Sequence, residues 1–242
     1  MRVGESLATY LIGSQAGYSR ELAGILLDAA QTEPVFVDNL APSTLKSALW
    51  NLDFADVAKM NGRYLLCPSP PGIRWLIEEQ MRPFGIAPRR ALVHPSSSID
   101  SSALIGGGTS VNRLVSIASR ASIGHHCQVN RNASIGHDCV IDDYVTIGPG
   151  ATIASGVKLR RGVFIGAGAI IIEGSEIGAN SVIGAGSVVI CSIPPLSVWV
   201  GNPARLIRES DSGYKGFSVA DGSLGQLTSL KRQRETPSSQ SG

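Results

Sequence analysis

Two consecutive hexapeptides of the chain read Ala133-Ser134-Ile135-Gly136-His137-Asp138 and Cys139-Val140-Ile141-Asp142-Asp143-Tyr144. In each hexapeptide the third residue is aliphatic and the first residue is small. The same spacing continues in both directions without an insertion. It places an aliphatic residue at sixteen consecutive positions, which are Ile99, Ile105, Val111, Ile117, Ile123, Val129, Ile135, Ile141, Ile147, Ile153, Leu159, Ile165, Ile171, Ile177, Ile183 and Val189.

A six-residue period describes a chain that turns a corner at regular intervals. It fits neither the 3.6-residue turn of an α-helix nor the two-residue alternation of a single strand. Each hexapeptide can instead form one face of a triangular prism, with three hexapeptides in one coil. The aliphatic side chain and the small residue two positions before it both point inward, by strand alternation. Successive coils would stack as parallel strands about 4.8 Å apart, so we predict a parallel β-helix over residues 94–190.

The composition agrees with a core of thin, repeated layers, since 43% of the residues are hydrophobic but only 5% are aromatic. A net charge of +2 does not indicate a nucleic-acid or anionic membrane partner. No apolar run reaches the roughly 18 residues that span a bilayer, and the pattern of the first residues leads us to expect no signal peptide. The four cysteines contain no CxxC pair, so we expect a reduced, cytoplasmic protein.

Residues 1–93 alternate between strand-like and helix-like segments, which indicates a small parallel α/β domain. Apolar runs predict strands at 9–12, 35–38 and 63–67, and amphipathic runs predict helices at 19–30 and 73–81.

At the other end of the chain, residues 191–210 are expected to cap the open end of the prism, where unpaired strand edges would be a liability. Residues 211–242 are rich in Ser, Gly and Gln, and their composition predicts a disordered tail.

The α/β segment, the prism and the ending Gly201-Asn202-Pro203-Ala204 together resemble one branch of the hexapeptide-repeat acyltransferases. This branch comprises the sugar-nucleotide and sialic-acid acetyltransferases of bacterial glycan pathways, and the resemblance covers about residues 8–209. It implies a left-handed β-helix preceded by a Rossmann-like domain that binds a sugar nucleotide. It also implies acetyl-CoA as co-substrate, no metal, and a homotrimer with active sites between neighbouring prisms.

The most specific part of the resemblance is a histidine and an acid that follow an asparagine by seven residues. These positions are held by Asn130, His137 and Asp138. The resemblance implies that the histidine is the general base, the acid raises its basicity and the asparagine lines the site. Such roles suit the chemistry, because an imidazole with a pKa near 6.5 can take a proton at pH 7, and an adjacent carboxylate stabilises the imidazolium.

The resemblance also implies positions for the two substrates. By position, acetyl-CoA would run along the prism past Thr146, Ala167 and Ala185, with Thr146 standing where the family often has a histidine. The sugar nucleotide would be contacted by the loop after the first strand and by the acid that ends the second strand. These positions are Gly13, Ala16, Gly17, Tyr18, Asp38 and Asn39.

These features predict transfer of an acetyl group from acetyl-CoA to the amino group of a nucleotide-linked sugar. The alternative within the family is O-acetylation of a sialic-acid-like hydroxyl. A zinc hydratase on the same prism would need three converging histidines, including a pair five residues apart. The histidines of this chain lie at 94, 125, 126 and 137 and include no such pair. A non-catalytic scaffold could also keep this fold, but the His137-Asp138 pair argues against it.

Overall fold

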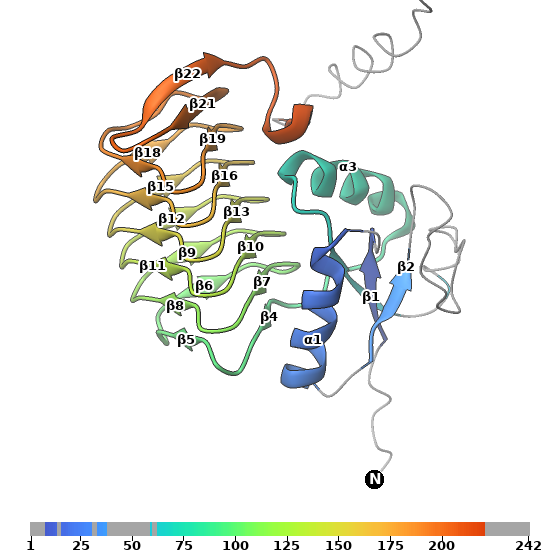
Figure 1. The fold of residues 1–242 in the computed structure, drawn as a ribbon. Helices are drawn as coiled ribbons and strands as arrows, with labels where there is room; N and C mark the ends of the chain where they lie inside the picture. The colour runs from blue at the N-terminus through green and yellow to red at the C-terminus, as the bar shows by residue number, and fades with distance from the viewer. Residues whose placement is uncertain (1–7, 14–15, 31–32, 38–58, 60–61, 221–242) are drawn as a thin grey trace, which may run out of the picture.

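A three-sided stack of short strands stands beside a smaller unit of strands and helices (Figure 1). This arrangement is seen in a computed structural model that describes residues 8–13, 16–30, 33–37, 59 and 62–220. Among these residues, no helix is long and apolar enough to cross a bilayer.

Each coil of the stack contributes one two-residue strand to each of three faces. The first face contains β4 (Leu92–Val93), β7 (Ser110–Val111), β10 (Gln128–Val129), β13 (Thr146–Ile147), β16 (Phe164–Ile165) and β19 (Val182–Ile183). The second face contains β5 (Ser98–Ile99), β8 (Ser116–Ile117), β11 (Ser134–Ile135), β14 (Thr152–Ile153), β17 (Ile170–Ile171) and β20 (Val188–Val189). The third face contains β6 (Leu104–Ile105), β9 (Ser122–Ile123), β12 (Val140–Ile141), β15 (Lys158–Leu159) and β18 (Glu176–Ile177).

All strands within these three stacks run parallel, and each pairs with the strand one coil away. Gln128 pairs with Thr146, a separation of 146 − 128 = 18 residues, or three hexapeptides. Fourteen of the sixteen aliphatic positions are buried, and the other two, Ile99 and Ile105, lie partly buried against the same core. The predicted parallel β-helix is therefore confirmed. Burial of each of these side chains stabilises the fold by roughly 1.5–3 kcal/mol.

Three corners join the faces. The first corner leads from the first face to the second, as at 130–132; the second leads to the third face, as at 136–138; and the third returns to the first face, as at 124–126. From Gly108 to Gly186, one residue of each such turn has a φ between about +55° and +73°, a conformation that glycine adopts most easily. Non-glycine residues nevertheless hold this position at Leu114, Arg120, His126, Asn132, Asp138, Tyr144 and Asn180.

The smaller unit has a parallel sheet in the order β2-β1-β3, formed by β2 (Val35–Val37), β1 (Thr9–Ile12) and β3 (Arg63–Leu66). Helix α1 (Tyr18–Ala30) packs on the side of Leu11 and Leu65. Helix α3 (Pro71–Met81), followed by the short helix η1 (Arg82–Phe84), packs on the opposite side, against alternate residues of the same strands. This alternation of strands and helices agrees with the α/β pattern of the sequence.

The α/β unit is held on the first face of the prism by Arg74 of α3, which is only 1% exposed. Its Nε donates a hydrogen bond to the carbonyl of His126, 2.9 Å away, and its Nη2 donates to the carbonyl of Tyr144 at 2.6 Å. Its Nη1 donates to the carbonyls of Pro68 and Ser69. Carbonyl oxygens from both parts of the chain thus satisfy one buried guanidinium. Burial lowers the pKa of Arg74 to about 10, which leaves it charged at neutral pH.

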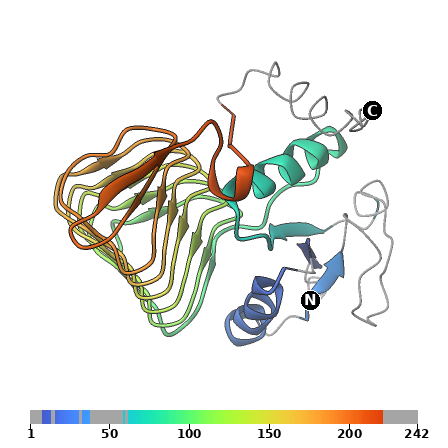
Figure 2. The ribbon, with the colours of Figure 1, turned by 45° about the horizontal axis from the view of Figure 1, so that its top comes forward.

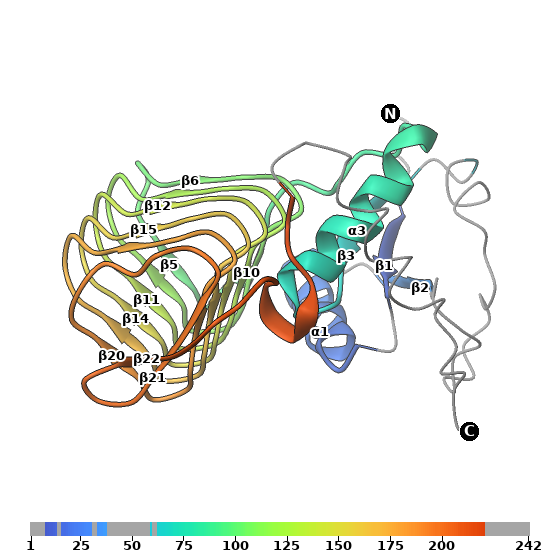
Figure 3. The same ribbon diagram turned by 90° about the horizontal axis from the view of Figure 1, so that it is seen from above.

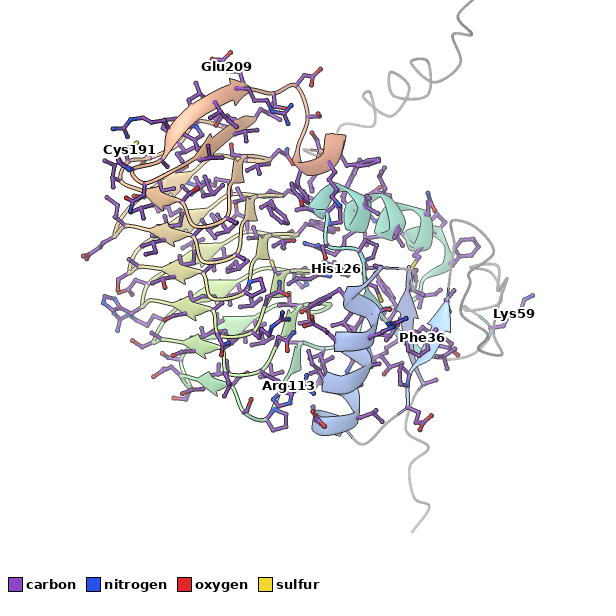
Figure 4. The ribbon with its side chains drawn as sticks, in the orientation of Figure 1. Phe36, Lys59, Arg113, His126, Cys191 and Glu209 are labelled. Atoms are coloured by element: carbon purple, nitrogen blue, oxygen red, sulfur yellow. The ribbon has the colours of Figure 1, made fainter. Side chains whose placement is uncertain are left out.

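The ring of His126 is buried in the same junction (Figure 4). It stacks between Tyr64 of β3, at 5.8 Å between ring centroids, and Tyr144 of the prism, at 5.4 Å. Burial is the main cause that lowers the pKa of His126 to about 3, and the charge of Arg74 adds to it. The ring is therefore neutral at physiological pH and packs as a flat, uncharged group between the α/β unit and the prism.

The chain leaves the prism through two longer strands at its upper end (Figure 1). Strand β21 (Ser197–Val200) pairs in parallel with β19, and β22 (Arg205–Glu209) returns antiparallel along β21. Residues 211–220, which the composition assigned to a disordered tail, are instead folded. Tyr214, in the short helix η2 (Tyr214–Gly216), stacks on Phe164 at 3.7 Å, and Val219 packs with Trp75 and Tyr144.

The predicted start of the tail at residue 211 was wrong because composition is an average over the whole segment 211–242. Within 211–220 a few apolar side chains find apolar partners on the first face and on α3. Residues 221–242 lie outside the part of the chain that the structure describes.

Two leucines of the third face allow a matched test of the core. Leu159 is fully buried, whereas Leu104 is 69% exposed on the same sheet. We expect Leu159→Ala to lower the free energy of unfolding by about 2–5 kcal/mol, because it leaves a cavity between coils. Leu104→Ala should change it by less than about 0.5 kcal/mol. Urea unfolding at one protein concentration measures both, and equal losses would contradict the assignment of the inner face.

The depressed pKa of His126 predicts a stability that depends on pH. The unfolded chain binds a proton at this ring near pH 6.5, whereas the folded chain does so only near pH 3. The stabilising contribution of the neutral ring is therefore complete above pH 6.5 and is lost as the pH falls between these values. Between pH 7 and pH 5 the loss should be about 2 kcal/mol.

His126→Phe keeps a flat ring but cannot titrate, so it should remove most of this difference in urea unfolding between pH 7 and pH 5. His125→Phe is the control, because His125 is exposed and adjacent. An unchanged pH dependence in His126→Phe would show that His126 does not cause it.

Candidate functional site

His137 lies at the second corner, where the chain turns from β11 to β12. Gly136 precedes it at a point of close contact, since a Cβ there would lie 2.6 Å from the backbone nitrogen of Ser155 in the next coil. Asp138 follows it with a φ of +59°. The carbonyl of His137 accepts a hydrogen bond from the nitrogen of Gly156 at 2.9 Å. The neighbouring coils thus fix the backbone of this corner and the point from which the side chain of His137 leaves the prism.

The imidazole is joined to two further side chains. Nδ1 of His137 lies 2.7 Å from Oδ2 of Asp138. Nε of Arg120 donates to Oδ1 of the same carboxylate at 2.7 Å, and its Nη2 donates to Oδ2 at 2.8 Å. The hydrogen bonds from Arg120, followed by that from His137, lower the pKa of Asp138 to about 2. With this carboxylate ionised, Nδ1 carries the hydrogen and Nε2 is left with a free electron pair, as a general base requires.

Two of the three predicted catalytic side chains, those of His137 and Asp138, are open to solvent. His137 is 53% exposed and Asp138 is 44% exposed in this single chain. The α/β unit covers the first face and reaches its first corner, where Glu21 pairs with Arg131 at 2.8 Å. The second corner lies on the opposite side of the prism from the α/β unit (Figures 2 and 3). The structure therefore does not bring His137 together with the nucleotide loop of its own chain.

Asn130, which the sequence placed in the same site, lies at the first corner. It is 9% exposed, and its Nδ2 donates a hydrogen bond to the carbonyl of Ile147 at 2.9 Å. Strand β11, a full face of the prism, separates it from His137. Within one chain the two side chains thus belong to different corners.

Ala167 and Ala185 are exposed and lie at the first corner as well, on coils above that of Asn130. They follow Arg131 and Pro149 at steps of 18 residues, so these four residues form one vertical line. The adjacent positions are glycines at 148, 150, 166, 168, 184 and 186. Two of the three predicted acetyl-CoA positions therefore share an open ridge of small residues.

Thr146 does not share this ridge. It points outward from the first face and is only 2% exposed, because the α/β unit covers that face. Its Oγ1 donates to the carbonyl of Ser69 at 2.8 Å and accepts a hydrogen bond from Nη2 of Arg74 at 2.9 Å. The side chain is thus engaged in the junction between the two parts of the chain.

The predicted nucleotide loop lies at the carboxyl ends of the parallel strands. Gly13 has a φ of +78°, and a Cβ there would come within 2.9 Å of Cγ of Pro68. The nitrogen of Ala16 donates to the carbonyl of Gly13 at 3.1 Å, and Gly17 is exposed. These three residues form the turn into α1, as expected of a loop that approaches a ligand with its backbone.

Tyr18 opens α1 but faces the prism. Its hydroxyl lies 3.4 Å from Oγ of Ser110, and burial raises its pKa to about 12. Asp38 and Asn39, the remaining predicted nucleotide contacts, lie outside the described residues.

Sequence reasoning missed Arg120 and Arg74. Arg120 stands one coil, 138 − 120 = 18 residues, before Asp138, so the repeat itself could have placed the two side chains one above the other. Arg74 binds mostly backbone carbonyls, for which the sequence carries no signal. In the part of the chain that the structure describes, no group of three or more His, Cys, Asp or Glu side chains could hold a metal.

A comparison with known families agrees with the repeat. Residues 120–155 and 156–191 match the family model described as bacterial transferase hexapeptide (six repeats). No curated protein matches the chain by sequence.

Solved structures with the same fold extend the similarity to the α/β unit. A histidine-to-asparagine variant of perosamine N-acetyltransferase from Caulobacter crescentus, in complex with CoA and GDP-perosamine, is 25% identical over 83% of this chain and 97% of its own, with a TM-score of 0.76. WeeI from Acinetobacter baumannii AYE is 25% identical over 84% of this chain and 100% of its own, with a TM-score of 0.75.

The acetyltransferase domain of PglB from Neisseria gonorrhoeae FA1090, in complex with acetyl coenzyme A, has a TM-score of 0.76. It is 23% identical over 84% of this chain and 100% of its own, so it shows the fold alone. The repeat match and the perosamine N-acetyltransferase confirm the resemblance to hexapeptide-repeat sugar acetyltransferases.

Proposed function

We propose that this chain is an acetyltransferase that moves the acetyl group of acetyl-CoA to the amino group of a nucleotide-linked sugar, with His137 as general base. The observation that carries the proposal is the hydrogen bond from His137 to an ionised carboxylate, which leaves Nε2 free at a rigid corner. Similar structures that bind CoA and GDP-perosamine support this choice of substrates. The cysteines of the described residues are free, which fits the proposed cytoplasmic location.

The side chains at the second corner can perform the proton transfer that this reaction needs. Acetyl-CoA would supply the thioester whose carbonyl carbon the sugar amine attacks. Nε2 of His137 would accept the proton that the amine loses as its bond to carbon forms. Asp138 would hold the ring by Nδ1 and stabilise its positive charge until the proton passes to the departing sulfur. No nucleophilic side chain is required.

The site is completed by a second copy of the chain. The first face is covered by the α/β unit, and the third face carries Lys158 and Glu176. The second face carries no charge on its outward positions, which are Ser98, Ser116, Ser134, Thr152, Ile170 and Val188. Copies that meet through this face would form a homotrimer and bring the second corner of one chain to the first corner of the next.

Such an assembly would place His137 beside Asn130, Ala167 and Ala185 of a neighbouring chain. The open ridge of small residues at the first corner leaves room for acetyl-CoA to lie along a left-handed prism. The pair of Glu21 and Arg131 keeps the start of α1 near this ridge. A sugar nucleotide held by a Rossmann-like unit at Gly13, Ala16 and Gly17 would therefore enter from the chain that supplies the ridge.

The role of His137 predicts the kinetics of its variants. His137→Ala should lower kcat at least about a hundredfold, because no other group at the corner can take the proton. Asp138→Asn should give a smaller loss, since it weakens the base but leaves the ring. Steady-state assays with acetyl-CoA and a panel of nucleotide-linked amino sugars and sialic-acid-like acceptors measure both.

His125→Ala is the matched control, because His125 is also exposed after an aliphatic residue of the repeat and should keep full activity. A loss under tenfold in His137→Ala, in a folded protein, counts against the base. If only the sialic-acid-like acceptor is acetylated, the proposed role of His137 stands but the proposed acceptor is wrong.

The shared site predicts complementation between two inactive variants. His137→Ala and Asn130→Ala should each lose at least tenfold in activity alone. Co-expression of the two should form mixed trimers in which an intact His137 meets an intact Asn130 at about a quarter of the interfaces. The mixture should then recover about a quarter of wild-type activity.

The control is a chain that carries both His137→Ala and Asn130→Ala. Its trimers contain no intact pair and should stay inactive. Absence of recovery, with trimers present by light scattering, would show that His137 of one chain does not work with Asn130 of its neighbour.

A further inference from the structure

We propose that Arg120 is a positioning residue for the general base, which it controls through Asp138; this proposal rests on the proposed function of His137. The guanidinium of Arg120 donates hydrogen bonds to both oxygens of the Asp138 carboxylate. It so fixes the oxygen that accepts the hydrogen bond from Nδ1–H of His137. It thereby orients the imidazole, and its charge limits how strongly the carboxylate promotes protonation of the ring.

The repeat builds this contact. Arg120 and Asp138 occupy equivalent left-handed turn positions on successive coils, with φ values of +56° and +59°. Their backbones are tied to adjacent coils, since the nitrogen of Arg120 donates a hydrogen bond to Oγ of Ser102 at 2.9 Å and that of Asp138 donates to the carbonyl of Ser119 at 3.1 Å. Most higher coils have glycine at this position, so the two side chains occupy a place that the fold could leave bare.

Hydrogen bonds to the preceding coil therefore fix the backbone at both Arg120 and Asp138, independently of the contact between their side chains. A fork of two nearly equal hydrogen bonds holds a carboxylate in one plane, which a single contact does not. Arg160 and Glu176 show the difference, because only Nε of Arg160 donates to that carboxylate, at 2.7 Å.

Arg120 and His137 share Oδ2 of Asp138, at 2.8 Å and 2.7 Å. The positive charge of Arg120 opposes the positive charge that His137 acquires during catalysis, and it also takes part of the carboxylate's hydrogen-bonding capacity. Without Arg120 the carboxylate would stabilise a protonated ring more strongly, but it could also rotate away from Nδ1. Loss of Arg120 should therefore move the titration of the base and disturb its orientation at the same time.

The test replaces Arg120 with methionine, which keeps much of the side-chain length but has no charge or donor. In Arg120→Met the acidic limb of the kcat/KM profile should move to higher pH by roughly 0.5–1 unit. At pH 8, kcat should fall about 3–10-fold with KM for acetyl-CoA changed less than about twofold. Arg120→Lys should restore the position of the limb but only part of kcat, because it keeps the charge and loses the fork.

Arg160→Gln is the matched control, because it breaks another exposed arginine–carboxylate pair of the prism and should leave both the limb and kcat unchanged. NMR titration of the imidazole signals provides a readout without substrate. The signal lost in His137→Ala identifies His137, and its midpoint should move to higher pH in Arg120→Met and stay in place in Arg160→Gln.

The outcomes separate the two proposals. A wild-type pH profile and titration in Arg120→Met, with His137→Ala inactive, overturns the role of Arg120 and leaves the base in place. Full activity in His137→Ala overturns the base and the positioning role together. A lower kcat in Arg120→Met with neither midpoint moved also overturns the proposal, because a purely structural defect has that effect.

Discussion

The vertical register between coils is the constraint on which the rest of the structure depends. Because paired residues of neighbouring coils are 18 positions apart, each side chain lies directly above its counterpart one coil earlier. The aliphatic residues fill the core by this rule, and the functional residues follow it on the outside. It places Arg120 next to Asp138 and aligns Ala167 with Ala185. A shift of one residue in a single coil would separate both pairs while exchanging inward and outward side chains.

The sequence predicted the inside of the prism well, because burial repeats with the chain and needs no knowledge of other segments. It predicted much less of the outside. Thr146 and Ala167 look alike as positions near the cofactor, yet Thr146 lies under the α/β unit and Ala167 on an open corner. Which face receives the α/β unit depends on contacts such as those of Arg74 with backbone carbonyls. Such acceptors exist at every residue, so no local pattern distinguishes them.

The candidate site shows the same division. The His137-Asp138 pair is contiguous and could be found from a short motif, and the structure forms the expected hydrogen bond between them. Arg120 is distant in the chain and close in space, so it is visible only once the repeat is treated as a three-dimensional register. Residues 211–220 also escaped prediction from the sequence. Tyr214 and Val219 pack onto apolar side chains of the prism and of α3. Composition describes a segment by itself and carries no information about such partners.

The separation of the site residues over two corners explains why a single chain is an incomplete catalyst under the proposed function. A prism held by hydrogen bonds between coils cannot bend, so His137 and Asn130 stay on different corners in every conformation that keeps the fold. A base that is half exposed also leaves water in contact with the reacting groups, which weakens the electrostatic interactions that catalysis uses. The proposed neighbouring copy on the uncharged second face would remove both defects at once. It would cover the imidazole and supply the first corner together with the α/β unit attached to it. The rigidity that keeps the residues of one chain apart would then hold those of two chains in register.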